Sequence, residues 1–208
     1  MFSSPTELCS IPLSRRPGST LRTLASWYGD MERAEQRDGW LAWCRKRHVS
    51  VACSMEFMHA LACALGNADA PVLEIGAGNG ELAEHLQDAG VDMIPTDWSP
   101  GSPAVIALEA RDALRRYNPR VVLTSFVPAD GGIERDILQY PSVHEYVYIG
   151  PLATGHRGLR SAWNVPGWKA ERLHEVEEVL ISRLDYLSDC TRQTHCRRAS
   201  ALQFTRIH

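Results

Sequence analysis

Residues 71–83 have the sequence Pro71-Val72-Leu73-Glu74-Ile75-Gly76-Ala77-Gly78-Asn79-Gly80-Glu81-Leu82-Ala83, and this stretch decides the fold of the chain. An apolar segment rich in β-branched residues ends at three glycines on alternate positions, and a helical pattern with Leu82 and Leu86 four residues apart follows at once. The stretch therefore predicts a buried strand, a tight turn and the first turn of a helix. The turn requires glycine because the backbone must adopt positive φ angles and let a ligand come close.

The spacing of the glycines distinguishes two kinds of nucleotide-binding turn. The fingerprint for NAD or FAD is G-x-G-x-x-G/A, whose third small residue lets helix and strand pack closely. Counted from Gly76, that third position is Glu81, and the glycine falls one residue early, at Gly80. Glu74 adds a carboxylate two residues before the first glycine, which does nothing for a pyrophosphate but suits a positively charged ligand. The pattern therefore favours a cationic ligand over a dinucleotide.

A second strand is predicted at residues 90–97, ending at Asp97 about 20 residues after the glycines. Nucleoside-binding α/β folds place a carboxylate at this point to hold the ribose hydroxyls. Trp98, the next residue, would then lie against the adenine. The alternative is that Asp97 caps the turn-rich loop at residues 99–101.

Together, Glu74-x-Gly76-x-Gly78-x-Gly80 and Asp97 resemble motifs I and II of the class I SAM-dependent methyltransferases. The resemblance extends from about residue 54 to the C-terminus. It implies an α/β fold, namely a Rossmann-like, seven-stranded, mostly parallel sheet with helices on both faces and an N-terminal helical cap. It also implies S-adenosyl-L-methionine (SAM) as the cofactor, bound by Glu74, Gly76, Ala77, Gly78, Asn79, Gly80, Asp97, Trp98, Ser125 and Phe126.

The acceptor side of the site is predicted at the end of a strand over residues 120–126, since ligands of open α/β sheets bind outside the carboxyl ends of the strands. Residues 124–128, Thr-Ser-Phe-Val-Pro, lack the Asn or Asp before Pro-Pro-Tyr that many DNA and protein-amide methyltransferases use, which counts against those substrates. A small-molecule acceptor is therefore expected. The catalytic residue stays unknown; the candidates are Ser125, Phe126, His156, Trp163 and Tyr28.

Periodicity and turn residues predict the remaining elements. Helices are expected at residues 54–66, with Ser54 as the N-cap, and at 111–117, 133–138 and 168–176. A strand is expected at residues 145–150. Residues 104–109 could follow a helix cap at Ser102-Pro103 or form a short strand, and the resemblance favours the strand, with the helix at 111–117 after it. Residues 179–184 and 201–207 are expected to form a closing antiparallel pair, as in the last two strands of the family.

Residues 1–20 are predicted to be a mobile lead-in, residues 21–53 an N-terminal helical lid, and residues 54–208 the SAM-binding Rossmann-like domain. The segment 21–53 concentrates aromatic residues, including Tyr28. These aromatics either bury the helices on the core or cover a sulfonium, which an aromatic face attracts.

Composition excludes several classes of protein. A formal net charge of −3 argues against nucleic acid as a partner. No apolar stretch reaches the length of a membrane span, and no leader segment is evident, so a cytoplasmic protein without membrane contact is expected. The six cysteines have no paired metal-ligand spacing, which predicts free thiols and no metal. The oligomeric state stays open.

Two other functions remain open on the same scaffold. One is different SAM chemistry, such as attack of the amino group of SAM on its own side chain to give azetidine-2-carboxylate and methylthioadenosine. The other is a non-catalytic SAM-binding module.

Overall fold

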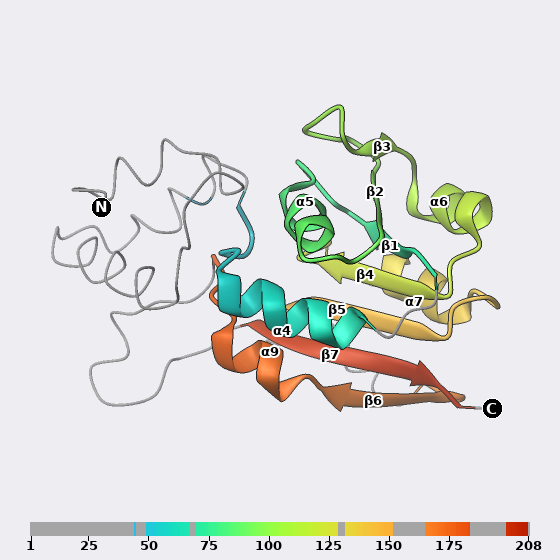
Figure 1. The fold of residues 1–208 in the computed structure, drawn as a ribbon. Helices are drawn as coiled ribbons and strands as arrows, with labels where there is room; N and C mark the ends of the chain where they lie inside the picture. The colour runs from blue at the N-terminus through green and yellow to red at the C-terminus, as the bar shows by residue number, and fades with distance from the viewer. Residues whose placement is uncertain are drawn as a thin grey trace, which may run out of the picture.

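The computed structural model describes residues 44, 49–66, 70–128, 132–151, 165–183 and 199–207. These residues form one seven-stranded sheet in the order β3-β2-β1-β4-β5-β7-β6 (Figure 1). The strands are β1 (Val72–Ile75), β2 (Met93–Asp97), β3 (Ile106–Ala107), β4 (Val121–Ser125), β5 (Glu145–Pro151), β6 (Trp168–Arg172) and β7 (Ala199–Arg206). The first five strands are parallel, whereas β7 runs antiparallel to both β5 and β6. The predicted α/β architecture is therefore confirmed, while the predicted N-terminal helical cap falls almost entirely outside the described residues.

Helices cover both faces of the sheet. On one face, α4 (Met55–Leu65), α5 (Glu81–Asp88) and α9 (His174–Val179) pack their apolar side chains into one core cluster. On the other face, α6 (Ala110–Tyr117) and α7 (Gly132–Gln139) contribute to a second cluster. Because helices screen both faces, the central strands are mostly apolar, and β1 is buried at all four of its positions, Glu74 included.

Local sequence explains where the helices begin and end. The Ser54 side chain accepts a hydrogen bond from the backbone N–H of Phe57 at 3.1 Å, which caps α4 as predicted. Asn118 ends α6 in a left-handed conformation, with φ of 44°. Among the described residues, none of the helices is long and apolar enough to cross a lipid bilayer.

The end of the sheet differs from the prediction. Residues 168–172, expected to be helical, form the edge strand β6, and only His174–Val179 is helix. The physical reason is the alternation of Trp168, which is buried, with Lys169 and Glu171, which point to solvent, as an edge strand requires. The closing antiparallel pair is therefore β6 with β7. Residues 179–183 are not a strand; Leu180 enters the core, and Ser182 forms a single bridge with Val51.

Candidate functional site

The glycine turn between β1 and α5 has the backbone that its sequence predicts. Gly76, Gly78 and Gly80 all have positive φ, at 80°, 59° and 82°. A Cβ at Gly76 would lie 2.6 Å from Val127, and one at Gly80 would lie 2.7 Å from Val105, so these two glycines permit close packing. An added Cβ at Gly78 would meet no atom of the described residues within 4 Å. The surface over Gly78 is therefore open for a ligand to approach the backbone.

The end of β2 holds this turn in place. The backbone carbonyl of Thr96 accepts hydrogen bonds from the N–H groups of Gly76 and Ala77, at 2.9 and 3.0 Å. The Thr96 hydroxyl donates to the carbonyl oxygen of Glu74 at 2.7 Å. The side-chain oxygen of Asn79 accepts from the N–H of Glu81 at 3.2 Å, which steadies the entry into α5. The conformation of the turn is thus fixed by the neighbouring strand before any ligand binds.

Asp97 lies at the carboxyl end of β2, directly beside the turn. Its Oδ2 accepts a hydrogen bond from the N–H of Gly78 at 2.8 Å, and its Oδ1 accepts one from Ser99 at 2.8 Å. Because each carboxylate oxygen has two lone pairs, both oxygens retain the capacity to accept a further donor. Trp98 follows with 73% of its surface exposed. Asp97 therefore braces the glycine turn and can still receive hydroxyl groups.

Glu74 is the most unusual group of the site. The residue is only 1% exposed, and among the described residues its Oε2 has no hydrogen-bond partner. Burial, and secondarily the negative charge of Asp97, raise the pKa of the Glu74 carboxyl from 4.5 to about 8. A carboxyl oxygen without a partner is costly to bury, and a ligand that donates to Oε2 would complete its interactions.

Glu74 lines a cavity of about 80 Å³ at the carboxyl edge of the sheet. The strand order reverses between β1 and β4, and open α/β sheets bind their ligands at such a switch point. Residues from three parts of the chain form the walls: the segment before α4, the glycine turn with the start of α5, and the end of β4. They are Val49, Ser50, Val51, Cys53, Glu74, Gly76, Ala77, Gly78, Asn79, Glu81, Leu82 and Ser125.

Phe126 follows the cavity residue Ser125 and has an uncommon backbone. Its φ is 55°, a left-handed conformation that bulky residues rarely adopt, and its N–H donates to the carbonyl of Ile149 at 2.8 Å. Such strained residues cluster at functional sites. The ring of Phe126 lies under the guanidinium of Arg183, with 5.2 Å from the guanidinium carbon to the ring centroid.

Sequence patterns did not identify the wall formed by residues 49–53. This segment is assigned by sequence to the lid, but Val51 and Cys53 pack in the same core cluster as α4, and it contributes four residues to the cavity. Its backbone is held by residues 181–183, because Ala52 N–H donates to the Ile181 carbonyl at 2.8 Å and Arg183 N–H donates to the Ser50 carbonyl at 3.0 Å. No local pattern connects two segments so far apart in sequence.

The predicted site residues therefore fall into three groups. Glu74, Gly76, Ala77, Gly78, Asn79 and Ser125 line the cavity together. Gly80, Asp97, Trp98 and Phe126 are neighbours of these residues but do not line it. The candidates Tyr28, His156 and Trp163 lie outside the described residues. Within the described part of the chain, no group of three His, Cys, Asp or Glu side chains could hold a metal ion.

Comparison with known proteins finds a likeness of fold. No family model matches the chain, and no curated protein matches it in sequence. A SAM-dependent methyltransferase from Bacteroides fragilis, crystallised with S-adenosyl-L-homocysteine (SAH), is 15% identical at a TM-score of 0.43, covering 72% of this chain and 77% of that one. A SAM-dependent methyltransferase from Archaeoglobus fulgidus is 13% identical at a TM-score of 0.44, covering 86% of this chain and 99% of that one. A 23S rRNA methyltransferase is 16% identical at a TM-score of 0.40, covering 74% of this chain and 68% of that one. At these values the likeness is one of general architecture.

The raised pKa of Glu74 predicts a particular dependence of stability on pH. Between pH 4.5 and about 8, the unfolded chain releases the Glu74 proton while the folded chain keeps it, so stability falls as pH rises. Glu74→Gln removes this loss. Relative to wild type, we expect the variant to gain on the order of 2–4 kcal/mol between pH 5 and pH 8, at about 1.4 kcal/mol per pKa unit.

Urea unfolding at a series of pH values measures this difference. The quantity compared is the slope of the free energy of unfolding against pH. A cost of burying the amide that does not depend on pH leaves this slope unchanged. Glu84→Gln on α5, an exposed carboxylate, is the matched control and should follow the wild-type profile. Parallel profiles for Glu74→Gln and wild type would contradict the assigned protonation of Glu74.

Proposed function

We propose that this chain is a SAM-dependent methyltransferase that acts on a small-molecule acceptor. One observation carries the proposal: a buried carboxyl with an unpartnered oxygen, Glu74, lines a cavity beside a left-handed glycine, Gly78, over which the surface is open. This arrangement suits a ligand that brings positive charge close to the backbone. A phosphate-bearing dinucleotide would instead place its negative charge against Glu74.

The residues present fit the parts of SAM. Glu74 would accept hydrogen bonds from the ammonium group, and Asp97 would receive the ribose hydroxyls on its remaining lone pairs. The exposed face of Trp98 would lie against the adenine. The small cavity suits only the amino-acid end of the ligand, so the sugar and base would lie outside it, toward Asp97 and Trp98.

When bound, SAM would supply a methyl group to a nucleophile by in-line displacement, with the neutral thioether SAH as the leaving group. Much of the catalysis of such a displacement can come from positioning the reactants and excluding water. Ser125 and Phe126, at the end of β4, would shape the acceptor side, and the strain at Phe126 supports a functional role there. A lid over residues 21–53, together with a contribution from Tyr28, His156 or Trp163, remains part of the proposal.

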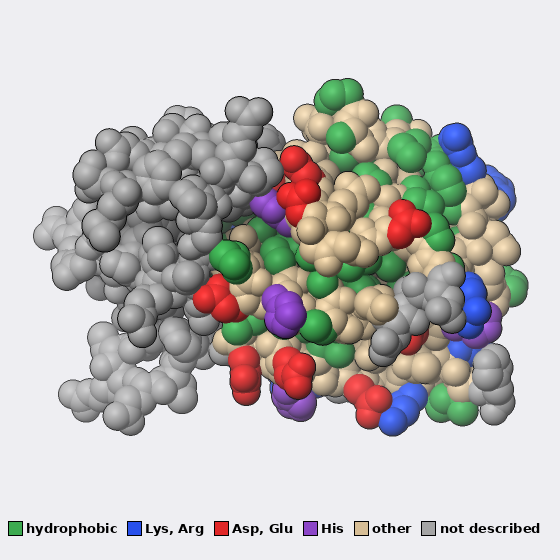
Figure 2. All heavy atoms as spheres, in the orientation of Figure 1, with side chains coloured by type: hydrophobic (Ala, Val, Ile, Leu, Met, Phe, Trp, Pro, Cys, Tyr) green, Lys and Arg blue, Asp and Glu red, His purple; other side chains and the backbone are tan. Residues whose placement is uncertain are grey.

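The choice of a small-molecule acceptor has two supports. The chain is acidic overall, with a net charge of −3. On the face drawn in Figure 2, the Lys and Arg side chains do not form one continuous patch, and acidic side chains are scattered over the same face. In the described part of the chain, Cys44 and Cys63 form no disulfide, which accords with the proposed cytoplasmic location.

Binding of SAH tests the placement of the ligand. We expect Gly78→Val and Asp97→Ala each to weaken SAH at least tenfold, about 1.4 kcal/mol, as measured by calorimetry. Gly90→Val is the matched control for the first, because Gly90 is also left-handed, with φ of 92°, and open around an added Cβ. Asp92→Ala, an exposed carboxylate before β2, controls the second. Wild-type affinity in both site variants would show that the ligand lies elsewhere.

Turnover separates the proposed reaction from its alternatives. The purified protein is incubated with SAM alone, with SAM and the low-molecular-mass fraction of a cell extract, and with SAM and total RNA. We expect SAH to accumulate only with the low-mass fraction. If SAM alone gives methylthioadenosine, the reaction is cyclisation and not methyl transfer. If SAH forms with RNA, the acceptor is RNA and not a small molecule. Tight binding of SAH without formation of any product would favour a non-catalytic SAM-binding module.

A further inference from the structure

Arg183 is joined to the cavity wall through its backbone. It follows α9, and its N–H donates to the carbonyl of Ser50, which lines the cavity, at 3.0 Å. Its neighbour Ser182, fully buried, pairs with Val51, another lining residue. The chain at Arg183 therefore cannot shift without moving the wall formed by residues 49–53.

The side chain of Arg183 contacts Phe126, a residue that adjoins a second wall of the same cavity without lining it. Its guanidinium stacks on the ring of Phe126, the residue after the lining residue Ser125. A guanidinium that stacks by its face keeps the N–H groups at its edge available for hydrogen bonds. Among the described residues, no carboxylate pairs with Arg183, and the side chain is only partly buried. Within the described residues, Arg183 is thus a hydrogen-bond donor beside the cavity wall without a carboxylate partner.

An acidic and a basic side chain therefore meet at one small cavity, because Glu74 lines it and Arg183 lies beside its wall. Glu74 on β1 offers a carboxyl with an unpartnered oxygen, and Arg183, held against Ser50 and Phe126, offers a guanidinium. A free α-amino acid group carries an ammonium and a carboxylate on the same carbon, and so needs both kinds of partner close together. Arginine suits the second role because its planar fork matches a carboxylate with two parallel hydrogen bonds.

We infer that Arg183 binds the α-carboxylate of the SAM amino-acid end, opposite Glu74, and so makes the site selective for nucleosides that keep this carboxylate. The inference rests on the proposed function and adds a specificity residue to it. Glu74 alone would accept any nucleoside with a cationic tail. Arg183 adds the requirement for a carboxylate and would therefore exclude decarboxylated SAM and methylthioadenosine.

Three ligands distinguish recognition of the ammonium group from recognition of the carboxylate. SAH carries both groups, decarboxylated SAH carries the ammonium only, and methylthioadenosine carries neither. Calorimetry with each is repeated on Arg183→Met and Arg183→Lys. We expect Arg183→Met to weaken SAH at least tenfold while changing the other two ligands less than twofold, so that its preference for SAH is lost. Arg183→Lys keeps the charge but not the fork and should recover part of the affinity for SAH.

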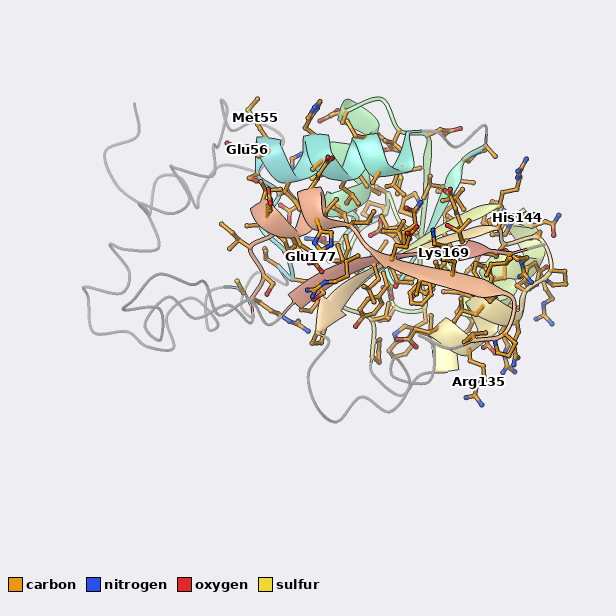
Figure 3. All side chains as sticks on the ribbon, turned by 90° about the horizontal axis from the view of Figure 1, so that it is seen from below. Met55, Glu56, Arg135, His144, Lys169 and Glu177 are labelled. Atoms are coloured by element: carbon orange, nitrogen blue, oxygen red, sulfur yellow. The ribbon has the colours of Figure 1, made fainter. Side chains whose placement is uncertain are left out.

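Arg135→Met is the matched control. In the described part of the chain, Arg135 on α7 lies far from Met55 and Glu56, which begin α4 next to the cavity wall (Figure 3). It should bind all three ligands as wild type does. If Arg183→Met weakens SAH and decarboxylated SAH equally, or leaves SAH unchanged, the inference is overturned while SAM binding stands. If wild-type protein binds none of the three, the proposed function fails first.

Discussion

Burying a carboxyl group costs free energy unless other groups complete its hydrogen bonds, and this constraint shapes the site around Glu74. The side chain lies at the end of a strand that is buried throughout, and burial together with Asp97 raises the pKa of its carboxyl to about 8. A leucine or valine at this position would pack without that cost. Under the proposed function, this carboxyl is kept for the cationic end of the ligand, which would complete its interactions.

The sheet brings the partners of Glu74 together through its topology. Parallel pairing of β1 with β2 places Thr96 and Asp97 beside the glycine turn, where they fix its backbone. Pairing of β1 with β4 places Ser125 on the other side of the switch point. The turn itself is left-handed at three glycines, so the sequence there cannot vary without strain or collision. The rigid part of the site thus comes from backbone hydrogen bonds between neighbouring strands.

Sequence alone could predict the parts of the site that depend on local patterns. The glycine turn and Asp97 each end a short apolar strand, and such signals depend only on neighbouring residues. The strand β6 was not predicted, because Trp168 and the apolar residues after Arg172 imitate a helical spacing. The wall at Val51 and the position of Arg183 depend on pairing between distant segments, which no local pattern reveals. The positive φ of Phe126 has no sequence signal at all, since its side chain disfavours it.

The central claim, that Glu74 receives the ammonium group of the ligand, is tested most directly by proton release. At pH 7 a carboxyl with a pKa of about 8 is mostly protonated, and a bound cation lowers that pKa. Calorimetry of SAH binding in buffers of different ionisation enthalpy counts the protons released. We expect release of close to one proton at pH 7 in the wild type and none in Glu74→Gln. Binding without proton release in the wild type, or equal release in both proteins, would contradict it.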